Sequence, residues 1–576
     1  MGVLLTYMKL QTVLAAITCL QLNIAFAQQE TWITNAQLID PAKKTIQTGM
    51  TVVFKDHLIV GIHKRKAPAD VVSIDAGGKY LMPGLTDAHV HFFQSGGLYT
   101  RPDIIDLRKI RPYEEEIKEV HAGLEQQLRR YVRNGITTVF DVGTTYRLLA
   151  RKKTFGDWAI RPQVYMSGPI ITTVAVAEYD HLKEDAPFVL ASNAAEGRRL
   201  VQEQLVYHPD FIKLLFSANG KAPVEYMPIV RAVIAQAHSH GLRVAVHATE
   251  RITAQLAVEA GADFLVHSVE DEVVDDAFVQ LLKDKKVVLC PTLSVETGYL
   301  HVFDQSRLFT TYELASADPF ALGSLYDLKQ LADTAVANQY KIKAHAHVDG
   351  TAAVNRVSRE NLKKLSDAGV LIVSGSDAGN IGTLHAVSLL PELMQMQQSG
   401  MSNWQVLQAA TIHPASILRL PGYTGNIAVG QPANMLLLQG NPADDLRELE
   451  HLDLVIQNGK VITPDTVSVS SPVALVQQQL NAYNSRNMEA FLSVYDENIA
   501  LFDFPDKLIR RGKEEMRKVY HFFGKAHLLH CRIVKRIVTG NVVIDEEHIL
   551  DDHGRRGGTA IYQIENGKIS KVYFID

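Results

Sequence analysis

Six residues of types that bind metal ions stand in or at the ends of short apolar runs in this chain. His89 and His91 are two apart in the run LTDAHVHF near 85–92, so a strand would present both side chains on one face. Other runs of the same kind carry Lys213, His247, His267 and Asp377. Four imidazoles and a carboxylate that converge would suit a divalent ion, zinc above all.

Lys213 needs a separate argument, because an ammonium group beside a cation is electrostatically unfavourable. Two arrangements would avoid this repulsion. Either the side chain points away from the metal-binding residues, or CO₂ converts it into a carbamate that bridges two metal ions. Spacing by itself is not specific, since His345 and His347 have the His-x-His spacing in a polar stretch that we interpret as a solvated loop.

A repeated helix–Gly–strand unit positions these residues. Gly135, Gly241, Gly261 and Gly369 each follow a helical stretch and precede an apolar run, as expected of helix C-caps. The runs are continuously apolar, which is typical of strands buried on both faces. Eight runs are found, near 85–92, 136–142, 163–168, 211–217, 242–248, 262–268, 286–293 and 370–377. Eight such units predict an α/β fold, a (β/α)8 TIM barrel with its chemistry at the carboxyl ends of the strands.

The remaining segments indicate further domains. Alternating, turn-rich stretches at both ends of the barrel predict one composite β-sandwich, and the Ser/Thr/Pro-rich segment is typical of a linker. We expect a β-sandwich of residues 28–80 and 421–463, a barrel of 81–420, a linker of 464–472 and a tail domain of 473–576.

Residues 1–27 are predicted to be a secretory signal peptide. Lys9 is the only charge, an apolar stretch LQTVLAAITCL follows, and Ala25 and Ala27 form an A-x-A cleavage site. We therefore expect a secreted or periplasmic protein. No later run reaches 18 apolar residues, so no membrane span is expected.

Composition excludes two classes of protein. The net charge of −5 argues against a protein that binds nucleic acid by neutralising phosphates. Three cysteines in 576 residues argue against a disulfide scaffold and against a site built of thiolates alone.

The chain resembles the metal-dependent amidohydrolase superfamily, in the imidazolonepropionase-like and Xaa-Pro-dipeptidase-like branch. The matching stretches include LMPGLTDAHVHF, DFIKLLFSANG, AHSHGLRVAVHATE, GADFLVHSVED and GVLIVSGSDAG. The resemblance implies a TIM barrel with a flanking β-sandwich and two divalent metal ions, zinc by preference. It assigns one ion to His89, His91 and Asp377 and the other to His247 and His267. Lys213, as N6-carboxylysine, would bridge the two.

By this resemblance the chain is expected to be an exported amidohydrolase that cleaves a C–N amide or peptide bond. A metal-bridging water, acidified to hydroxide, would attack, and Asp377 would carry the proton to the leaving nitrogen. We expect a small-molecule substrate such as a dipeptide or an N-acyl amino acid. The alternative is a mononuclear deaminase or a cyclic amide or lactone hydrolase. Glu250, three residues after His247, would then shuttle a proton, whereas an ordinary acid at a helix N-terminus is the simpler interpretation.

Two residues are candidates for binding the substrate. Tyr226 falls where dipeptidase relatives place a substrate-facing tyrosine. Arg101 follows the first metal motif, and it either holds a substrate carboxylate or lies at the surface.

The tail resembles a SnoaL-like, nuclear-transport-factor-2-like α+β cone fold. An amphipathic stretch over 473–495 predicts one helix, and short strands follow it. Such a domain serves as a non-catalytic module for dimerisation or ligand binding, so a homo-oligomer assembled through the tail is expected.

Overall fold

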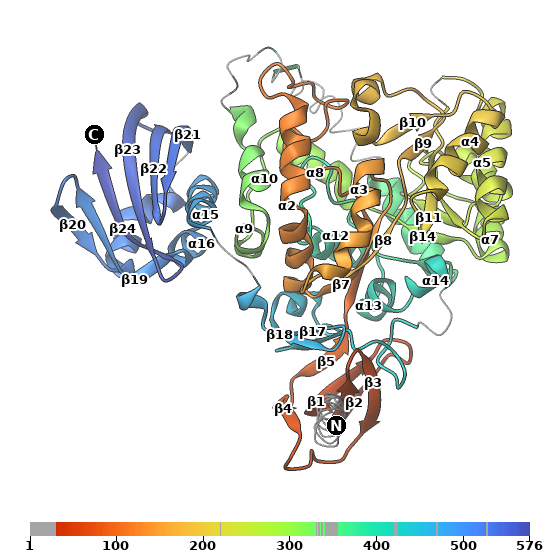
Figure 1. Cartoon of the computed structure of the whole chain (residues 1–576), viewed down its shortest axis with the longest axis horizontal. Helices are drawn as coiled ribbons and strands as arrows, with labels where there is room; N and C mark the ends of the chain where they lie inside the picture. Colours follow the sequence, from red (N-terminus) through yellow and green to blue (C-terminus); the bar gives the residue numbers. More distant parts are fainter. Residues whose placement is uncertain are drawn as a thin grey trace, which may run out of the picture.

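The computed structural model describes residues 30–218, 220–329, 331, 335, 338–339, 355–419, 424–467, 471–525 and 528–575. The predicted signal peptide and the pair His345 and His347 lie outside these residues. Figure 1 shows three parts, namely a central barrel, a β domain at one end of it and a tail domain at its side.

The central part contains the eight predicted strands. They are β6 (Leu85–Val90), β7 (Ile136–Asp141), β8 (Gln163–Met166), β11 (Phe211–Leu215), β12 (Arg243–His247), β13 (Phe264–Val266), β14 (Val288–Cys290) and β15 (Leu371–Ile372). Neighbouring strands pair in parallel. Two backbone bonds connect the two sheets, from Ala88 N–H to Ser374 O at 2.9 Å and from Asp210 N–H to Met166 O at 2.8 Å. The barrel prediction is confirmed.

Two further strands extend this sheet. β9 (Ile170–Thr172) pairs with β11, and β10 (Phe188–Leu190) pairs with β9. Both belong to the long connection between β8 and β11, and the sequence analysis did not predict them.

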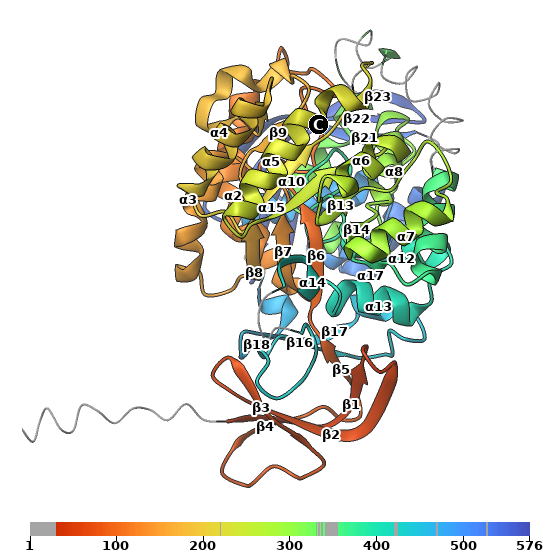
Figure 2. The same ribbon diagram turned by 90° about the vertical axis from the view of Figure 1, so that its right-hand side faces the viewer.

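Helices surround the strands, as Figure 2 shows. They are α2 (Tyr113–Arg133), α3 (Tyr146–Arg151), α4 (Ala194–Leu205), α5 (Met227–Ser239), α6 (Arg251–Glu259), α7 (Asp276–Lys285), α8 (Ser294–Phe303), α9 (Thr311–Ser316), α10 (Pro319–Ser324), α12 (Leu389–Gln398), α13 (Asn403–Thr411) and α14 (Ala415–Leu418). The four glycines predicted to follow helices all have positive φ, between 73° and 105°, which confirms their role as helix ends.

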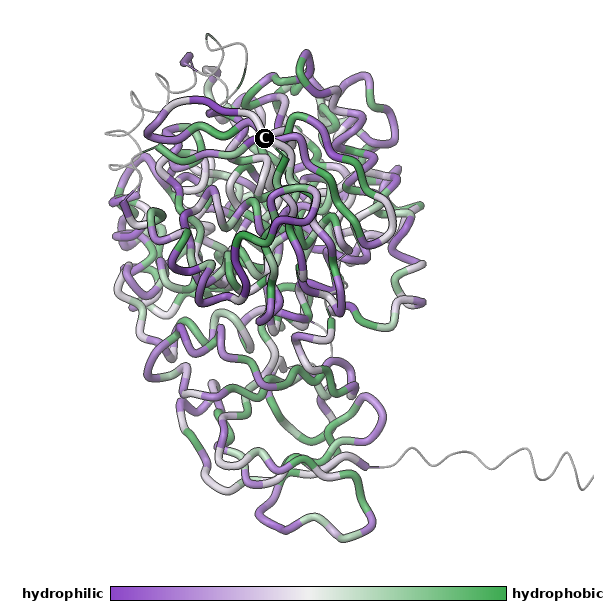
Figure 3. Tube along the Cα trace, turned by 90° about the vertical axis from the view of Figure 1, so that its left-hand side faces the viewer, coloured by the Kyte–Doolittle hydropathy of each residue, from purple (hydrophilic) through white to green (hydrophobic). Residues whose placement is uncertain are grey.

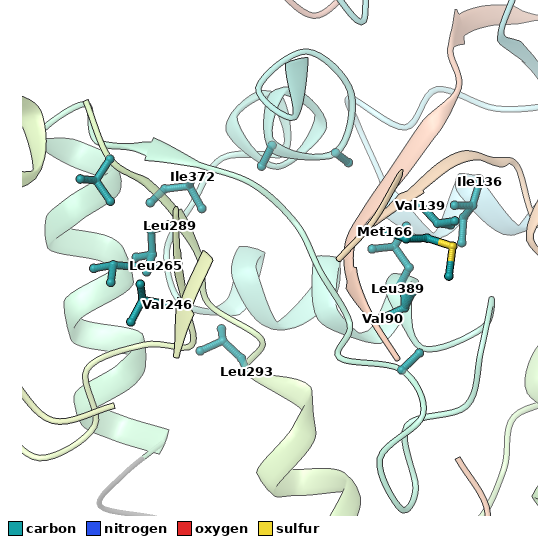
Figure 4. Packing of buried hydrophobic residues seen from close by; sticks show 14 of the residues in the cluster. Val90, Ile136, Val139, Met166, Val246, Leu265, Leu289, Leu293, Ile372 and Leu389 are labelled. Atoms are coloured by element: carbon teal, nitrogen blue, oxygen red, sulfur yellow. The ribbon is translucent and has the colours of Figure 1, made fainter. Parts of the chain in front are cut away.

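Successive residues of each strand pack into two different clusters. Val246, Leu265 and Leu289 lie between the strands and the helices, and Figure 4 shows them side by side. Ala245 and Cys290, their chain neighbours, belong to a cluster inside the barrel. This alternation decides which polar residues can reach the interior.

The β domain combines both flanks of the barrel. Its strands are β1 (Thr31–Asp40), β2 (Thr45–Lys55), β3 (Leu58–His63), β4 (Val72–Asp75), β5 (Tyr80–Pro83), β16 (Met435–Leu438), β17 (Leu452–Gln457) and β18 (Lys460–Ile462). The composite origin is confirmed, but these strands form one hydrogen-bonded sheet instead of two facing sheets. Leu58 bridges to Pro432, so the sheet curls back on its own residues around a core that includes Phe54 and Ile456.

The tail has helices α15 (Pro472–Asn484), α16 (Met488–Ser493) and α17 (Lys513–Val519). Its six strands are β19 (Tyr495–Asp503), β20 (Lys507–Arg511), β21 (Leu529–Thr539), β22 (Val542–Asp551), β23 (Gly554–Glu565) and β24 (Lys568–Ile575). The single helix predicted over 473–495 is wrong. Arg486, with φ of 55°, ends the first helix, and the side chain of Asn487 caps the second.

Helix α15 joins the tail to the barrel. Asn481 donates its amide hydrogen to the carbonyl of Pro319 at 2.7 Å, and one apolar cluster includes both Leu480 and Leu322. Figure 3 shows hydrophilic residues concentrated on outer turns and helices. Within the described residues, no helix combines the length and apolar character that crossing a membrane requires.

Candidate metal centre

The structure gathers the predicted ligands at the carboxyl ends of the barrel strands. His89 lies on β6 and His91 follows that strand directly, while His247 is the last residue of β12. His267 follows β13, and Asp377 lies in the segment after β15. All five therefore reach the same end of the barrel.

His89, His91 and Asp377 are in close contact. The Nε2 atoms of the two imidazoles are 3.2 Å apart, and they lie 3.4 Å and 3.1 Å from Asp377 Oδ1. Ligand atoms of His89, His267 and Asp377 all lie within 4.8 Å of one another. Three donor atoms at such spacing can share one small cation.

The atoms of this group fit a divalent metal ion. His89 is fully buried, and the Oδ1 of Asp377, which the Nε2 of His89 faces at 3.4 Å, has no hydrogen-bond partner among the described residues. Burial holds the pKa of His89 well below its usual value, so the imidazole is neutral and offers a lone pair. Buried polar atoms without partners are costly, and a cation held by neutral imidazoles and a carboxylate removes that cost.

The rings of His247 and His267 lie side by side, next to His89. Their ring centroids are 4.4 Å apart, and the ring of His267 lies 5.1 Å from that of His89. Burial lowers the pKa of His247 well below its usual value and that of His267 to about 3. Both imidazoles are therefore neutral near pH 7.

Lys213 lies on β11, the strand that pairs with the His247 strand β12. It shares the inward face of β11 with Phe211, its side chain is 2% exposed, and its charge acts on His89, His247 and His267. Burial lowers its pKa to about 7, so much of the amine is unprotonated at neutral pH. Its place on the inward face of β11 favours the interpretation in which Lys213 faces the metal-binding residues.

Neighbouring groups orient three of the ligands. His91 Nδ1 lies 2.9 Å from the carbonyl oxygen of Gly143, and because that oxygen only accepts, the ring donates from Nδ1 and keeps Nε2 free. Thr292 Oγ1 contacts His267 Nδ1 at 2.6 Å. Asp377 donates its backbone N–H to the carbonyl of His89 at 2.7 Å, which ties the two ligand segments together.

A buried carboxylate supports the same segments. Asp87 accepts bonds from the backbone N–H of Ser376 at 2.9 Å and from its hydroxyl at 2.6 Å. Burial raises the pKa of Asp87 to about 7. The bonds fix Ser376 beside Asp377, so Asp87 positions the ligand without belonging to the cluster.

The backbone at the site is unusual in three places. His267, Thr292 and Asp377 have φ of 74°, 48° and 53°, in the left-handed region that residues with a side chain rarely adopt. At His267 the positive φ changes the direction of the side chain. Val266 already points into the barrel, so strand alternation would turn the next residue outward, and the positive φ brings the imidazole back to the site.

Arg101 lies at the edge of the centre. Its guanidinium makes two bonds to Asp103, at 2.8 Å and 2.6 Å, and it also donates to Asn380 and, at 3.2 Å, to Tyr299. Asn380 in turn donates to the backbone carbonyl of Asp377 at 3.2 Å. Arg101 is 16% exposed, so the surface alternative is wrong, and most of its donors are already bound to this chain.

The remaining candidates lie nearby but outside these contacts. Tyr226 ends the short helix of residues 223–226 after β11, half-buried, with Lys221 Nζ 5.9 Å from its ring centre. Glu250 is exposed at the N-cap of α6, which confirms its helix-terminal placement.

Sequence analysis missed the supporting residues. Asp87 could have been predicted from the sequence, because it continues the two-residue period of His89 and His91 in the same run. Thr292 and Asn380 follow strands but have no pattern of their own, and only the fold brings them to the ligands.

Comparison with known proteins agrees with this geometry. The amidohydrolase family profile matches residues 80–463, and the SnoaL-like domain profile matches residues 476–572. Imidazolonepropionase of Brevibacillus brevis is 23% identical over 428 residues, which are 70% of this chain and 86% of that protein.

Solved structures are similar in fold. A Xaa-Pro dipeptidase with bound methionine in its active site superposes with a TM-score of 0.57 at 22% identity, covering 75% of this chain and all of that one. Molinate hydrolase superposes with a TM-score of 0.58 at 18% identity, covering 77% of this chain and 97% of that one. Together with the barrel and its cluster of buried ligands, the family match over residues 80–463 shows that this chain belongs to the amidohydrolase family, with a SnoaL-like domain following its barrel.

Proposed function

We propose that this protein cleaves a C–N amide or peptide bond of a small substrate, such as a dipeptide or an N-acyl amino acid, with the help of two zinc ions. An enzyme of the amidohydrolase family is a hydrolase of carbon–nitrogen bonds. The observation that carries the finer proposal is the convergence of His89, His91, His267 and the carboxylate of Asp377 within one buried cluster.

His89, His91 and Asp377 would hold one ion, and His247 and His267 the other. Lys213 fits the bridging position, since its unprotonated amine can attack CO₂ and form an anionic carbamate. The ions, when bound, lower the pKa of a water molecule and polarise the substrate carbonyl.

Asp377 is proposed to move the proton. Its Oδ1 has no hydrogen-bond partner among the described residues, although it faces the imidazoles. It can therefore accept the proton of the attacking water and return it to the leaving nitrogen. Asp87, Ser376 and Asn380 hold the segment around it, so the carboxylate does not need to reorganise during the reaction.

Tyr226 is our candidate for contact with the substrate, supported by its place after β11 at the end of the barrel that carries the ligands. Arg101 is better suited to positioning Asn380 than to binding a carboxylate, because Asp103 already occupies two of its donors.

A mononuclear hydrolase of a cyclic amide or lactone, or a deaminase, is the second candidate. His89, His267 and Asp377 by themselves fit one ion, and a relative is named imidazolonepropionase. Release of ammonia with one ion per chain would favour the deaminase.

We further propose that the protein is exported, which the features of residues 1–27 support, and that the tail is a non-catalytic module for dimerisation or ligand binding. Exposed apolar residues on its sheet, including Leu508, Val534 and Ile537, support an oligomer. Sizing the full chain against a chain ending before α15 tests this, since an assembly that survives truncation does not depend on the tail.

The function is tested by a screen of the zinc-loaded protein against dipeptides, N-acyl amino acids and lactones. We expect turnover of an amide substrate that is lost in Asp377→Asn. Turnover of a lactone alone, or equal activity of the Asp377→Asn protein, would overturn the proposal.

A further inference from the structure

A cavity of about 1180 Å³ lies between the barrel and the tail, away from the metal centre. Helix α2 and the short helix of residues 327–329 line it on the barrel side, and α15 and β21 line it on the tail side. Its volume is slightly above the range of about 300–1,000 Å³ that is typical of small-molecule sites, which often lie between domains. Nothing in the proposed chemistry uses it.

A buried imidazole faces this cavity without a partner. His530, on β21, is 6% exposed, and its Nδ1 has no hydrogen-bond partner among the described residues. Burial lowers its pKa to about 4, helped by the charges of Lys329 and Arg532, so the ring is neutral. A buried polar atom of this kind is rare without a ligand or a water molecule.

Two opposite charges also line the cavity without forming an ion pair. Asp327 comes from the barrel side and accepts a hydrogen bond from the hydroxyl of Tyr99 at 2.8 Å. Arg532 comes from the tail and is exposed, and within the described residues its side chain makes no hydrogen bond or ion pair. Burial raises the pKa of Asp327 to about 6, and the positive charge of Arg532 opposes that rise. The two side chains are therefore close enough to interact electrostatically.

Other charges around the cavity are paired. Arg130 contacts Asp318 at 2.9 Å, and Arg111 contacts Glu119 at 2.5 Å. Among the described charged residues that line the cavity, Asp327 and Arg532 are those without an ion pair.

An apolar patch forms one part of the remaining wall, beside polar side chains that include Gln126 and Gln477. Val120, Leu384 and Leu480 line the cavity, and the ring of Tyr326 lies beside His530 with centroids 6.2 Å apart. Such walls favour a ligand with an apolar body and disfavour an inorganic ion.

We propose that this cavity binds a zwitterionic α-amino acid with an apolar side chain. Arg532 and the Nδ1–H of His530 bind its carboxylate, and Asp327 binds its ammonium group. The side chain lies against the apolar wall. An amino acid satisfies both unpaired charges and the unpartnered imidazole at once, which an anion or a cation alone does not.

Equilibrium dialysis of radiolabelled L-leucine with the metal-loaded full chain tests the proposal. We expect saturable binding that Arg532→Gln and Asp327→Asn each weaken at least tenfold. Arg555→Gln is the matched control, because Arg555 is exposed on strand β23 of the same sheet and does not line the cavity. Its binding should equal that of the unaltered protein.

Leucine bound at the metal centre must be told apart from leucine in the cavity. Repeating the dialysis with EDTA removes binding that needs the metal, and Ala122→Trp narrows the cavity from α2 without changing a charge. We expect binding to persist in EDTA and to be lost in Ala122→Trp. Loss of all binding in EDTA, or equal binding by Arg532→Gln and the unaltered protein, would overturn the proposal. Neither result depends on whether the enzyme hydrolyses an amide.

Discussion

Replacement of Arg101 by methionine is expected to destabilise the protein and to slow turnover. Arg101 and Asp103 are joined by two bonds and are only 16% and 13% exposed. Methionine keeps the length of the side chain but leaves the Asp103 carboxylate without its cation. The segment also loses the bond to Asn380, which contacts the backbone of Asp377.

The magnitude follows from burial. Breaking a buried ion pair by removing one partner costs about 3–5 kcal/mol, and we take about 3 kcal/mol here because both side chains keep some contact with water. At about 2 °C per kcal/mol for a large domain, the thermal midpoint of the barrel should fall by about 6 °C.

The same loop contains a matched control. Arg108 and Asp106 are also two residues apart and form the same two-bond pair at 2.8 Å, but they are 36% and 52% exposed. Solvent screens such a pair, so Arg108→Met should cost less than about 1 kcal/mol.

Thermal unfolding followed by circular dichroism measures the effect, together with the double variant Arg101→Met/Asp103→Leu. The double variant should recover most of the loss, because no unpaired carboxylate remains. Steady-state kinetics should show a lower kcat at nearly constant KM. If Arg101→Met lowers the thermal midpoint no more than Arg108→Met does, burial does not strengthen the Arg101–Asp103 ion pair, which would refute the argument. A raised KM at constant kcat would show that Arg101 binds the substrate instead.

Three further predictions concern other groups. Asp377→Asn should lower kcat by about 10²–10⁴ with metal content mostly retained, as metal analysis and turnover assays can show, and an active variant would remove its role in proton transfer. Thr292→Val removes the hydroxyl beside His267 and should weaken metal binding by about 10–100-fold in a chelator competition, whereas unchanged affinity would deny it an orienting role. Burial raises the pKa of Glu547 in the tail from 4.5 to about 7, so the folded state holds this proton more tightly than the unfolded state. Stability from this group is therefore complete below pH 4.5 and is lost as pH rises to 7, by up to about 3 kcal/mol. Glu547→Gln should have a higher thermal midpoint at pH 8 and a smaller change between pH 5 and pH 8, and an unchanged pH profile would contradict the assignment.

The strands and most ligands could be predicted because their signals are local. An apolar run after Gly241 or Gly369 reflects burial on both faces and a left-handed helix end, and both properties depend on a few adjacent residues. His89 and His91 follow from the two-residue period in the same way.

His267 could be found for a reason that is only partly correct. Its position at the end of a run suggested a ligand, but the run's own alternation places Val266 inside the barrel and would turn His267 away. The positive φ that corrects this depends on the packing around the segment, which no local pattern reports.

The contacts that bury Arg101 and the break in the tail helix could not be predicted from local sequence patterns. Arg101 is buried because Asn380 and Tyr299, which are almost 200 residues or more away along the chain, contact it. The break at Arg486 interrupts a stretch whose apolar pattern continues on both sides, so periodicity alone predicts one helix.

The number of metal ions bound per chain, measured with and without Lys213, tests the central proposal most directly. We predict two zinc ions in the unaltered protein and loss of the second in Lys213→Ala, with recovery when a short carboxylate such as propionate is added. Two ions retained by Lys213→Ala without added carboxylate, or a single ion in the unaltered protein, would contradict a carbamate-bridged pair of metal ions.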